Sequence, residues 1–160
     1  MNDLLNILRQ EVELHEQLIS LLQTESEGFG HLRGSELLKL QGEKSRCVRA
    51  TSRLERERIL LVEKLADTWE VEPQELTLKV IISRAETVYS EPLQECYDRL
   101  KTLLIEIRKV ADKNSLQAAG RLKSVESSIQ FMSQLQSGPP TYSDAGKIQK
   151  GTSITPRTEA

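Results

Sequence analysis

Apolar side chains recur every three or four residues along most of this chain, and that period constrains its fold more than any other feature. A helix of 3.6 residues per turn brings such positions onto one face, whereas a half-buried strand needs strict alternation. The period runs through three long stretches, at about residues 3–27, 36–69 and 92–135. We therefore predict an all-α protein, an antiparallel bundle or coiled coil of three long helices.

Glycine and proline lie where the period stops, so they mark the expected breaks. The glycine-rich stretch EGFGHLRG at 27–34 should be a turn, with Ser35 as the N-cap of the second helix. Pro73 opens the next break and begins, at best, a short helical segment. Pro92 suits the first turn of the last long helix, where its missing N–H has little consequence.

The last helix is ended by the sequence SGPP, which cannot continue it. The residues after it are rich in Gly, Ser, Thr and Pro and have no periodic apolar face. We expect a helical domain at 1–136 and a flexible tail at 137–160.

The first two helices carry opposite charge. The first 36 residues contain seven acids against Arg9 and Arg33, whereas the stretch 44–58 is rich in arginine. Packing the acidic helix antiparallel to the basic one would place opposite charges beside the apolar seam. Such pairs contribute about 0–1 kcal/mol each at a surface, so we expect them to set register more than stability.

Composition and charge exclude several classes of function. A formal net charge of −2 gives no reason to expect a nucleic-acid partner, and the arginines of 44–58 alternate with acids and lack aromatic residues for base stacking. No window approaches 18 uninterrupted apolar residues, so we expect no membrane insertion. The start of the chain lacks the features of a signal peptide. Cys47 and Cys96 are isolated and suit buried thiols in a reducing cytoplasm.

The sequence offers no arrangement for catalysis. His15 and His31 are the only histidines, and no second histidine or cysteine lies within one turn of His15. We find no nucleophile beside a base and no phosphate-binding loop after a strand. We therefore predict that the protein is not an enzyme and needs no cofactor or metal.

Binding of another protein is the remaining function, and the end of the last helix is the candidate site. Its apolar row continues toward the C-terminus at Leu122, Val125, Ile129 and Met132. These side chains would suit an amphipathic partner helix docking against them. The alternative is a coiled-coil structural or adaptor protein in which the last helix is fully internal. The sequence leaves the oligomeric state open, a homo-oligomer included.

Three motifs resemble the FlgN-type flagellar export chaperones. The stretch RGSELLKLQGEKSRCVRATSRLERER at 33–58 is similar to the second helix of that family, with Lys44 about two turns in. KNSLQAAGRL at 113–122 carries Asn114 where these chaperones have an asparagine in the last long helix. PTYSDAG resembles the Tyr-Gly-x-x-Gly-like turn that often follows. Each motif is weak alone, and their joint order along the chain carries the resemblance.

The resemblance implies a cytoplasmic, ATP-independent chaperone of the flagellar type III export system. Such chaperones bind the C-terminal helices of the hook–filament junction proteins FlgK and FlgL, prevent their premature assembly and deliver them to the export gate. For this chain we expect cargo binding at Leu122, Val125, Ile129 and Met132. Tyr142, a lone aromatic in a polar segment, is then the expected docking residue for the cytosolic domain of the gate.

Overall fold

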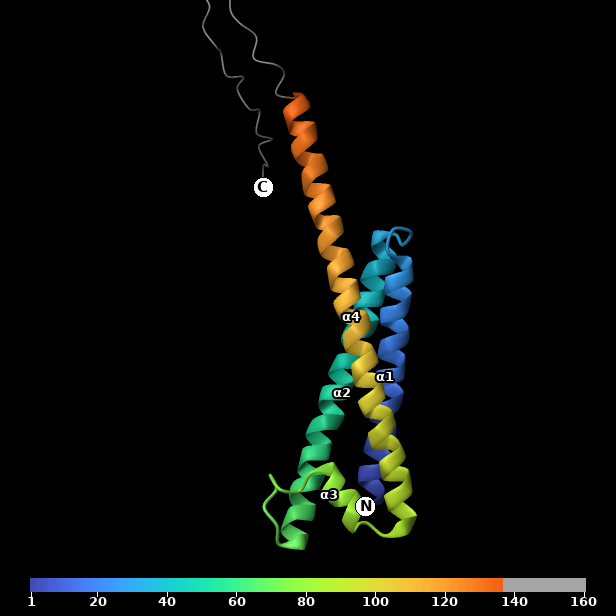
Figure 1. Cartoon of the computed structure of the whole chain (residues 1–160), viewed down its shortest axis with the longest axis vertical. Helices are drawn as coiled ribbons and strands as arrows, with labels where there is room; N and C mark the ends of the chain where they lie inside the picture. The colour runs from blue at the N-terminus through green and yellow to red at the C-terminus, as the bar shows by residue number, and fades with distance from the viewer. Residues whose placement is uncertain (137–160) are drawn as a thin grey trace, which may run out of the picture. The chain divides into compact units, whose positions relative to one another are not determined.

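The structure, a computed structural model, describes residues 1–136 and contains four helices there (Figure 1). Three are long: α1 (Asn2–Gly28), α2 (Gly34–Trp69) and α4 (Thr87–Gln136). The fourth, α3 (Leu78–Arg84), is a single short helix between α2 and α4. The all-α prediction is confirmed, and the helix count is four because the expected short segment forms a helix of its own. The predicted tail at 137–160 lies outside the described residues.

Two of the predicted helix starts are late, the second helix by two residues and the last by about five. Helix α2 begins at Gly34 rather than after Ser35, and the Glu36 carboxylate accepts a 2.7 Å hydrogen bond from the backbone N–H of Arg33. Helix α4 begins at Thr87, so Pro92 lies in its second turn. The N–H of Ser90 still bonds to the Glu86 carbonyl at 2.9 Å, so the first turn is closed before the proline.

The turn between α1 and α2 and the end of α2 each contain one residue with a positive φ angle. Gly30, between α1 and α2, has a φ of 107°, which a residue with a side chain rarely adopts. Glu70 ends α2 at φ 53° and donates its N–H back to the last turn of that helix. Both breaks were expected from the sequence, and together they turn the chain back on itself.

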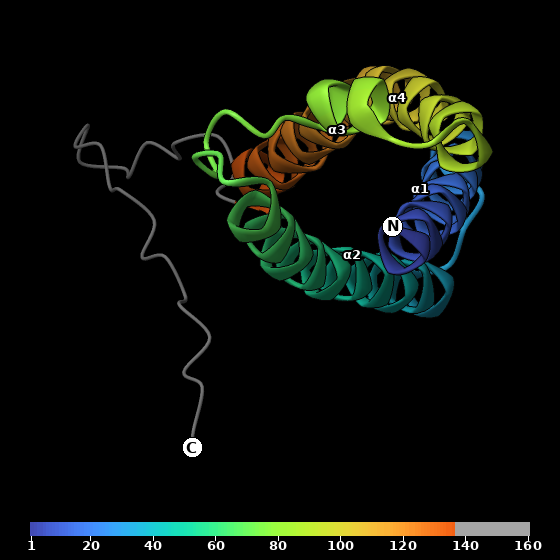
Figure 2. The same cartoon turned by 90° about the horizontal axis from the view of Figure 1, so that it is seen from below.

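Met1–Ser115 forms one compact unit, and a second begins at Leu116. Within the first unit α1 lies beside both α2 and the first half of α4 (Figure 2). Ion pairs joining Glu11 to Arg58 and Glu25 to Lys44 show that α2 runs antiparallel to α1. Glu16 pairs with Arg99, and residues further along α1 meet residues further along α4, so those two helices run parallel.

The main core lies where the start of α1, the end of α2, α3 and the start of α4 meet. Its members are small or aliphatic and buried: Leu4, Leu5, Leu8, Ala66, Leu76, Ile81, Ile82, Leu93 and Cys96. Helix α3 contributes Ile81 and Ile82 to this cluster, so a seven-residue helix is held by burial rather than by its own propensity.

Two adjacent leucines on α4 differ sharply in exposure. Leu103 is 1% exposed, whereas Leu104 is 54% exposed. The two leucines are adjacent, so spacing alone could assign the seam to either one. Burial in the folded protein selects Leu103.

Candidate functional site

The second half of α4 is helical but uncovered. Helix α4 continues to Gln136, and every described side chain from Ala118 to Gln134 is exposed. This includes several large apolar residues, which in a single folded chain are usually the first to be buried. The segment is therefore an amphipathic helix whose apolar side has no covering element in the described residues.

The four predicted cargo-binding residues lie on this segment. Leu122, Val125, Ile129 and Met132 are exposed to 62, 55, 58 and 54%, respectively. Their spacing of three, four and three residues brings them onto one face, which we call the apolar stripe. Phe131 and Leu116 are also exposed, at 61 and 77%, which enlarges the apolar surface of the segment.

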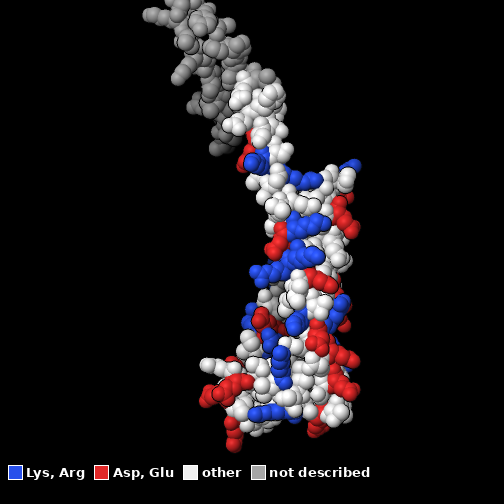
Figure 3. All heavy atoms as spheres, in the orientation of Figure 1, with Lys and Arg blue, Asp and Glu red and all other residues white. Residues whose placement is uncertain are grey.

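The segment is also poor in charge. Between residues 116 and 136 the only ionisable side chains are Arg121, Lys123 and Glu126, and none follows Glu126 within the helix. On the face seen in Figure 3, the last turns of α4 accordingly show no Lys, Arg, Asp or Glu. Serine and glutamine occupy the other polar positions, so the apolar stripe has mostly neutral flanks.

The apolar stripe continues the face by which α4 packs in the first unit. Val125 and Met132 follow Asn114 by 11 and 18 residues, about three and five helical turns. All three therefore point to one side of α4. Asn114 itself is 5% exposed, so this side changes from buried to exposed within a few residues.

Four polar side chains, of which Glu25 and Asn114 are buried, meet at that change, and we call them the polar cluster. It joins Glu25 of α1, Gln41 and Lys44 of α2, and Asn114 of α4. The Glu25 carboxylate accepts from Lys44 at 2.6 Å and from Gln41 at 3.1 Å on one oxygen, and from Asn114 at 2.9 Å on the other. Asn114 also donates to the Leu22 carbonyl at 2.8 Å.

The polar cluster ties all three long helices at one level. A buried carboxylate is tolerated only when paired and hydrogen-bonded, and Glu25 has both a cation and two amide donors. Lys44 and Asn114 were singled out from the sequence as family motif residues, and the structure brings them to the same carboxylate. Glu25 was missed, although it interrupts the apolar face of α1 seven residues after Leu18.

Glu11 is a second buried acid of α1 that, like Glu25, pairs with a basic residue of α2. It is 6% exposed, and its carboxylate lies 3.4 Å from the Arg58 guanidinium. Burial raises the pKa of Glu11 above its ordinary value, against the opposing effect of Arg58 and a smaller one of His15. Desolvation therefore outweighs the ion pair at this position.

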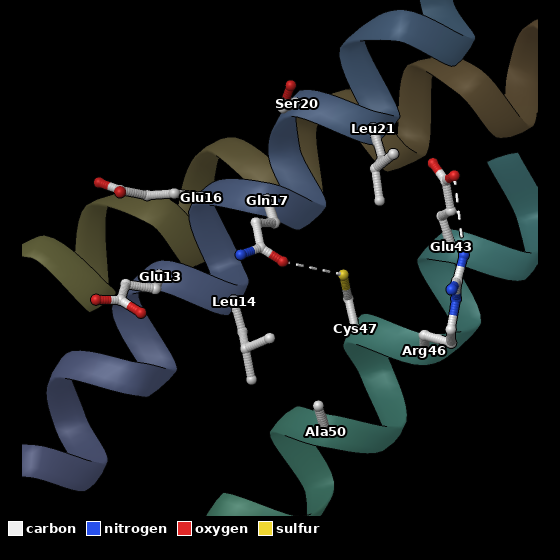
Figure 4. A pocket seen from close by; sticks show the side chains of 10 residues that line it. All are labelled: Glu13, Leu14, Glu16, Gln17, Ser20, Leu21, Glu43, Arg46, Cys47 and Ala50. Carbon is white, nitrogen blue, oxygen red and sulfur yellow. Dashed lines mark hydrogen bonds and ion pairs between the residues drawn. The ribbon is translucent and has the colours of Figure 1, made fainter.

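An open groove of about 830 Å³ runs between α1 and α2 on the first unit (Figure 4). Leu14 and Leu21 of α1 line it opposite Cys47 and Ala50 of α2. The Cys47 thiol lies 4.0 Å from the Gln17 side-chain oxygen, across the groove. The small side chains of Cys47 and Ala50 leave this space on the α2 side.

The remaining candidates from the sequence show no chemistry of their own. His15 places Nδ1 2.6 Å from the backbone carbonyl of Glu11, one turn earlier. Cys47 and Cys96 are buried and unpaired. Over residues 1–136 no three His, Cys, Asp or Glu side chains gather as metal ligands, and no helix there is long and apolar enough to cross a membrane. Tyr142 lies outside the described residues.

Residues 1–136 are helical, with a packed first unit and an exposed apolar face on the second half of α4, an arrangement typical of helical protein-binding modules. The family model described as FlgN protein matches residues 1–150, and the chain belongs to that family of flagellar export chaperones. The resemblance drawn from the sequence motifs is thereby confirmed. A search of curated proteins and a search of solved structures each found no match.

Proposed function

We propose that this protein is a cytoplasmic chaperone for the hook–filament junction proteins FlgK and FlgL, and that it binds their C-terminal helices through the apolar stripe. Membership of the FlgN family supports the general role in flagellar export. The exposure of Leu122, Val125, Ile129 and Met132 is the observation that carries the choice of surface. Binding there prevents premature assembly, and the complex is then delivered to the type III export gate.

The chemistry of the apolar stripe suits a reversible complex with an amphipathic helix. The terminal helices of a subunit waiting to assemble lack their final partners and expose apolar surface that favours aggregation. Burying one large aliphatic side chain contributes at most about 1.5–3 kcal/mol, and association entropy offsets much of the sum over four. Moderate affinity follows, and it allows the cargo to leave at the gate.

A pair of charge insertions tests the surface. Val125→Asp with Ile129→Asp places two carboxylates in the apolar stripe, where a docked helix would desolvate them. Ser127→Asp with Gln130→Asp adds the same charge to the opposite side of the same turns and is the matched control. We expect cargo capture by the stripe variant to fall at least about 100-fold, the loss of roughly 3 kcal/mol. The control should stay within about threefold.

Circular dichroism completes that test, because both variants should keep the helical content of the parent. If the stripe variant stays helical and captures FlgK and FlgL as well as the parent, the cargo surface lies elsewhere. The adaptor alternative, with α4 fully internal, predicts instead that Val125→Asp with Ile129→Asp unfolds the protein. The exposure of those side chains in the single chain favours the chaperone.

A separate segment would deliver the complex to the export gate. We take residues 1–136 as the chaperone domain and 137–160 as a C-terminal segment whose Tyr142 docks to the cytosolic domain of the export gate. A tyrosine offers large contact area with few rotatable bonds, which suits a docking residue. Tyr142→Ala should spare cargo binding while weakening gate binding and export. Loss of cargo binding in that variant would reject the assignment.

A further inference from the structure

The cargo-binding segment is a weak helix by its own sequence. Gly120 lies within it, and four of its other positions are serines, which favour caps and turns over helix interiors: Ser124, Ser127, Ser128 and Ser133. Helix nucleation is costly, and most helical stability in proteins comes from tertiary packing, which this segment lacks in the described structure. The helical state of residues 116–136 must therefore be propagated from the part of α4 that is packed.

The polar cluster fixes the last packed turn before that segment. Asn114 makes two hydrogen bonds to α1, at 2.8 Å to the Leu22 carbonyl and 2.9 Å to the Glu25 carboxylate. Glu25 is itself held by Lys44, whose side chain is 14% exposed. Gly120 follows Asn114 by six positions in α4, so the fixed turn lies shortly before the residue of lowest helix propensity in the segment.

We propose that Asn114, Glu25 and Lys44 are positioning residues that set cargo affinity without touching cargo. By holding the turn at Asn114, they supply a nucleus from which residues 116–136 extend as helix, so less order has to be created when the cargo binds. This inference rests on the proposed function, because it requires that the apolar stripe is the cargo surface.

Hydrogen bonds suit this role better than an apolar residue at position 114. An apolar seam position tolerates sliding by a heptad, whereas a buried asparagine with defined partners specifies register. The bonds of Asn114 go to a backbone carbonyl and a carboxylate that is already held by two other side chains. The point at which α4 stops packing and the exposed segment starts is thereby defined.

Two glycine substitutions make the test specific. Gly120 in α4 and Gly42 in α2 are both inside helices, and among the described residues no side chain lies within 4 Å of an added methyl group at either position. Alanine at each should raise helix propensity by a similar amount. Only Gly120→Ala acts on the cargo-binding segment, so Gly42→Ala is the matched control.

The full-length protein is titrated calorimetrically with a peptide of the FlgK C-terminal helix, and hydrogen exchange is followed in residues 116–134. We expect Asn114→Ala to weaken binding about 10-fold, with a less favourable binding entropy and faster exchange in the segment. Adding Gly120→Ala should recover about threefold to fivefold of that loss, and alone it should strengthen binding by a similar factor. Gly42→Ala should change neither quantity.

The outcomes separate this inference from the function on which it rests. If Val125→Asp with Ile129→Asp abolishes binding while Asn114→Ala leaves it unchanged, the apolar stripe is the cargo surface and the positioning role is wrong. If neither variant changes binding, the proposed cargo surface itself is wrong. If Asn114→Ala fails to fold, Gly120→Ala alone decides: slower exchange without tighter binding overturns the inference.

Discussion

The two halves of α4 share one helix and one apolar period, yet they differ in charge and burial. Residues 93–113 carry nine ionisable acids and bases, whereas the equally long stretch 116–136 carries Arg121, Lys123 and Glu126. The first half buries Leu93 and Leu103, and the second half buries none of its described large apolar residues. The packed half thus has a charged outer side and a covered seam. The exposed half has the same apolar row, but no other described element buries it. An exposed apolar row of this kind suits binding of a partner helix.

Hydrogen exchange gives the largest expected difference between the halves. Amides of 93–111 open only with the first unit, so we expect protection of at least about 1000-fold there. Amides of 118–134 have no tertiary packing in the described structure, and their protection should stay below about 100-fold. Exchange of the intact protein at neutral pH, resolved by mass spectrometry of peptides, measures both. Equal protection would mean that the second half is covered in solution, as the adaptor alternative requires.

Two leucine truncations compare the halves by stability. Leu103→Ala removes a side chain that is 1% exposed and should lower the free energy of unfolding by about 2–5 kcal/mol. Leu122→Ala removes the same atoms from an exposed position and should change it by less than about 0.5 kcal/mol. Urea unfolding followed by circular dichroism measures both. A large loss for Leu122→Ala would show that the apolar stripe stabilises the fold rather than a complex.

The contrast between the halves was only partly accessible from the sequence. Periodicity gave the three long helices and their breaks, because a buried face needs a repeat of three and four. It also gave the residues of the apolar stripe, since they continue the same repeat. It could not show where the apolar row of α4 stops being buried by other helices, because the pattern around Ile107 and that around Val125 are alike. Cover depends on how far α1 extends alongside α4, and that is set by tertiary register.

The buried acids show a second limit of pattern reasoning. Glu11 and Glu25 lie on the apolar face of α1, but from sequence a glutamate there is indistinguishable from a solvated one. Their partners, Arg58 and Lys44, are more than 18 residues away along the chain, so no local spacing connects them. The expected attraction between an acidic first helix and a basic second helix was sound, and the antiparallel pairing supplies the particular pairs.

A surface ion pair tests whether charge holds the packed half in place. Arg99 donates to the Glu16 carboxylate at 2.7 and 2.9 Å, and both side chains are about half exposed. A double-mutant cycle with Arg99→Ala and Glu16→Ala should give a coupling of only about 0.2–1 kcal/mol, smaller still in high salt. A coupling above about 2 kcal/mol would assign the packing of α4 to charge rather than to its buried leucines.

Changing the pH should alter the free energy of unfolding of the packed unit through Glu11, and this is the smallest of the expected effects. Burial raises the pKa of Glu11 in the folded state, so its neutral form is favoured there relative to the unfolded chain. This favourable contribution is complete below the unfolded pKa and is lost as pH rises through the folded pKa. Glu11→Gln lacks that titration. The parent should therefore lose stability relative to Glu11→Gln as pH is raised from about 4 to 7, the range in which carboxyl groups ionise.

Urea unfolding of the two proteins across that range measures the difference, and Glu13→Gln is the control, because Glu13 is an exposed acid only two residues away. A difference that grows in the opposite direction would mean that Arg58 outweighs desolvation and that the ion pair stabilises the fold. Cargo binding by the second half should not follow the Glu11 titration, because the apolar stripe contains no ionisable group. If cargo binding changed with pH in step with the ionisation of Glu11, the packed unit and the exposed half of α4 would be energetically coupled. Their contrast in charge and burial predicts that they are independent.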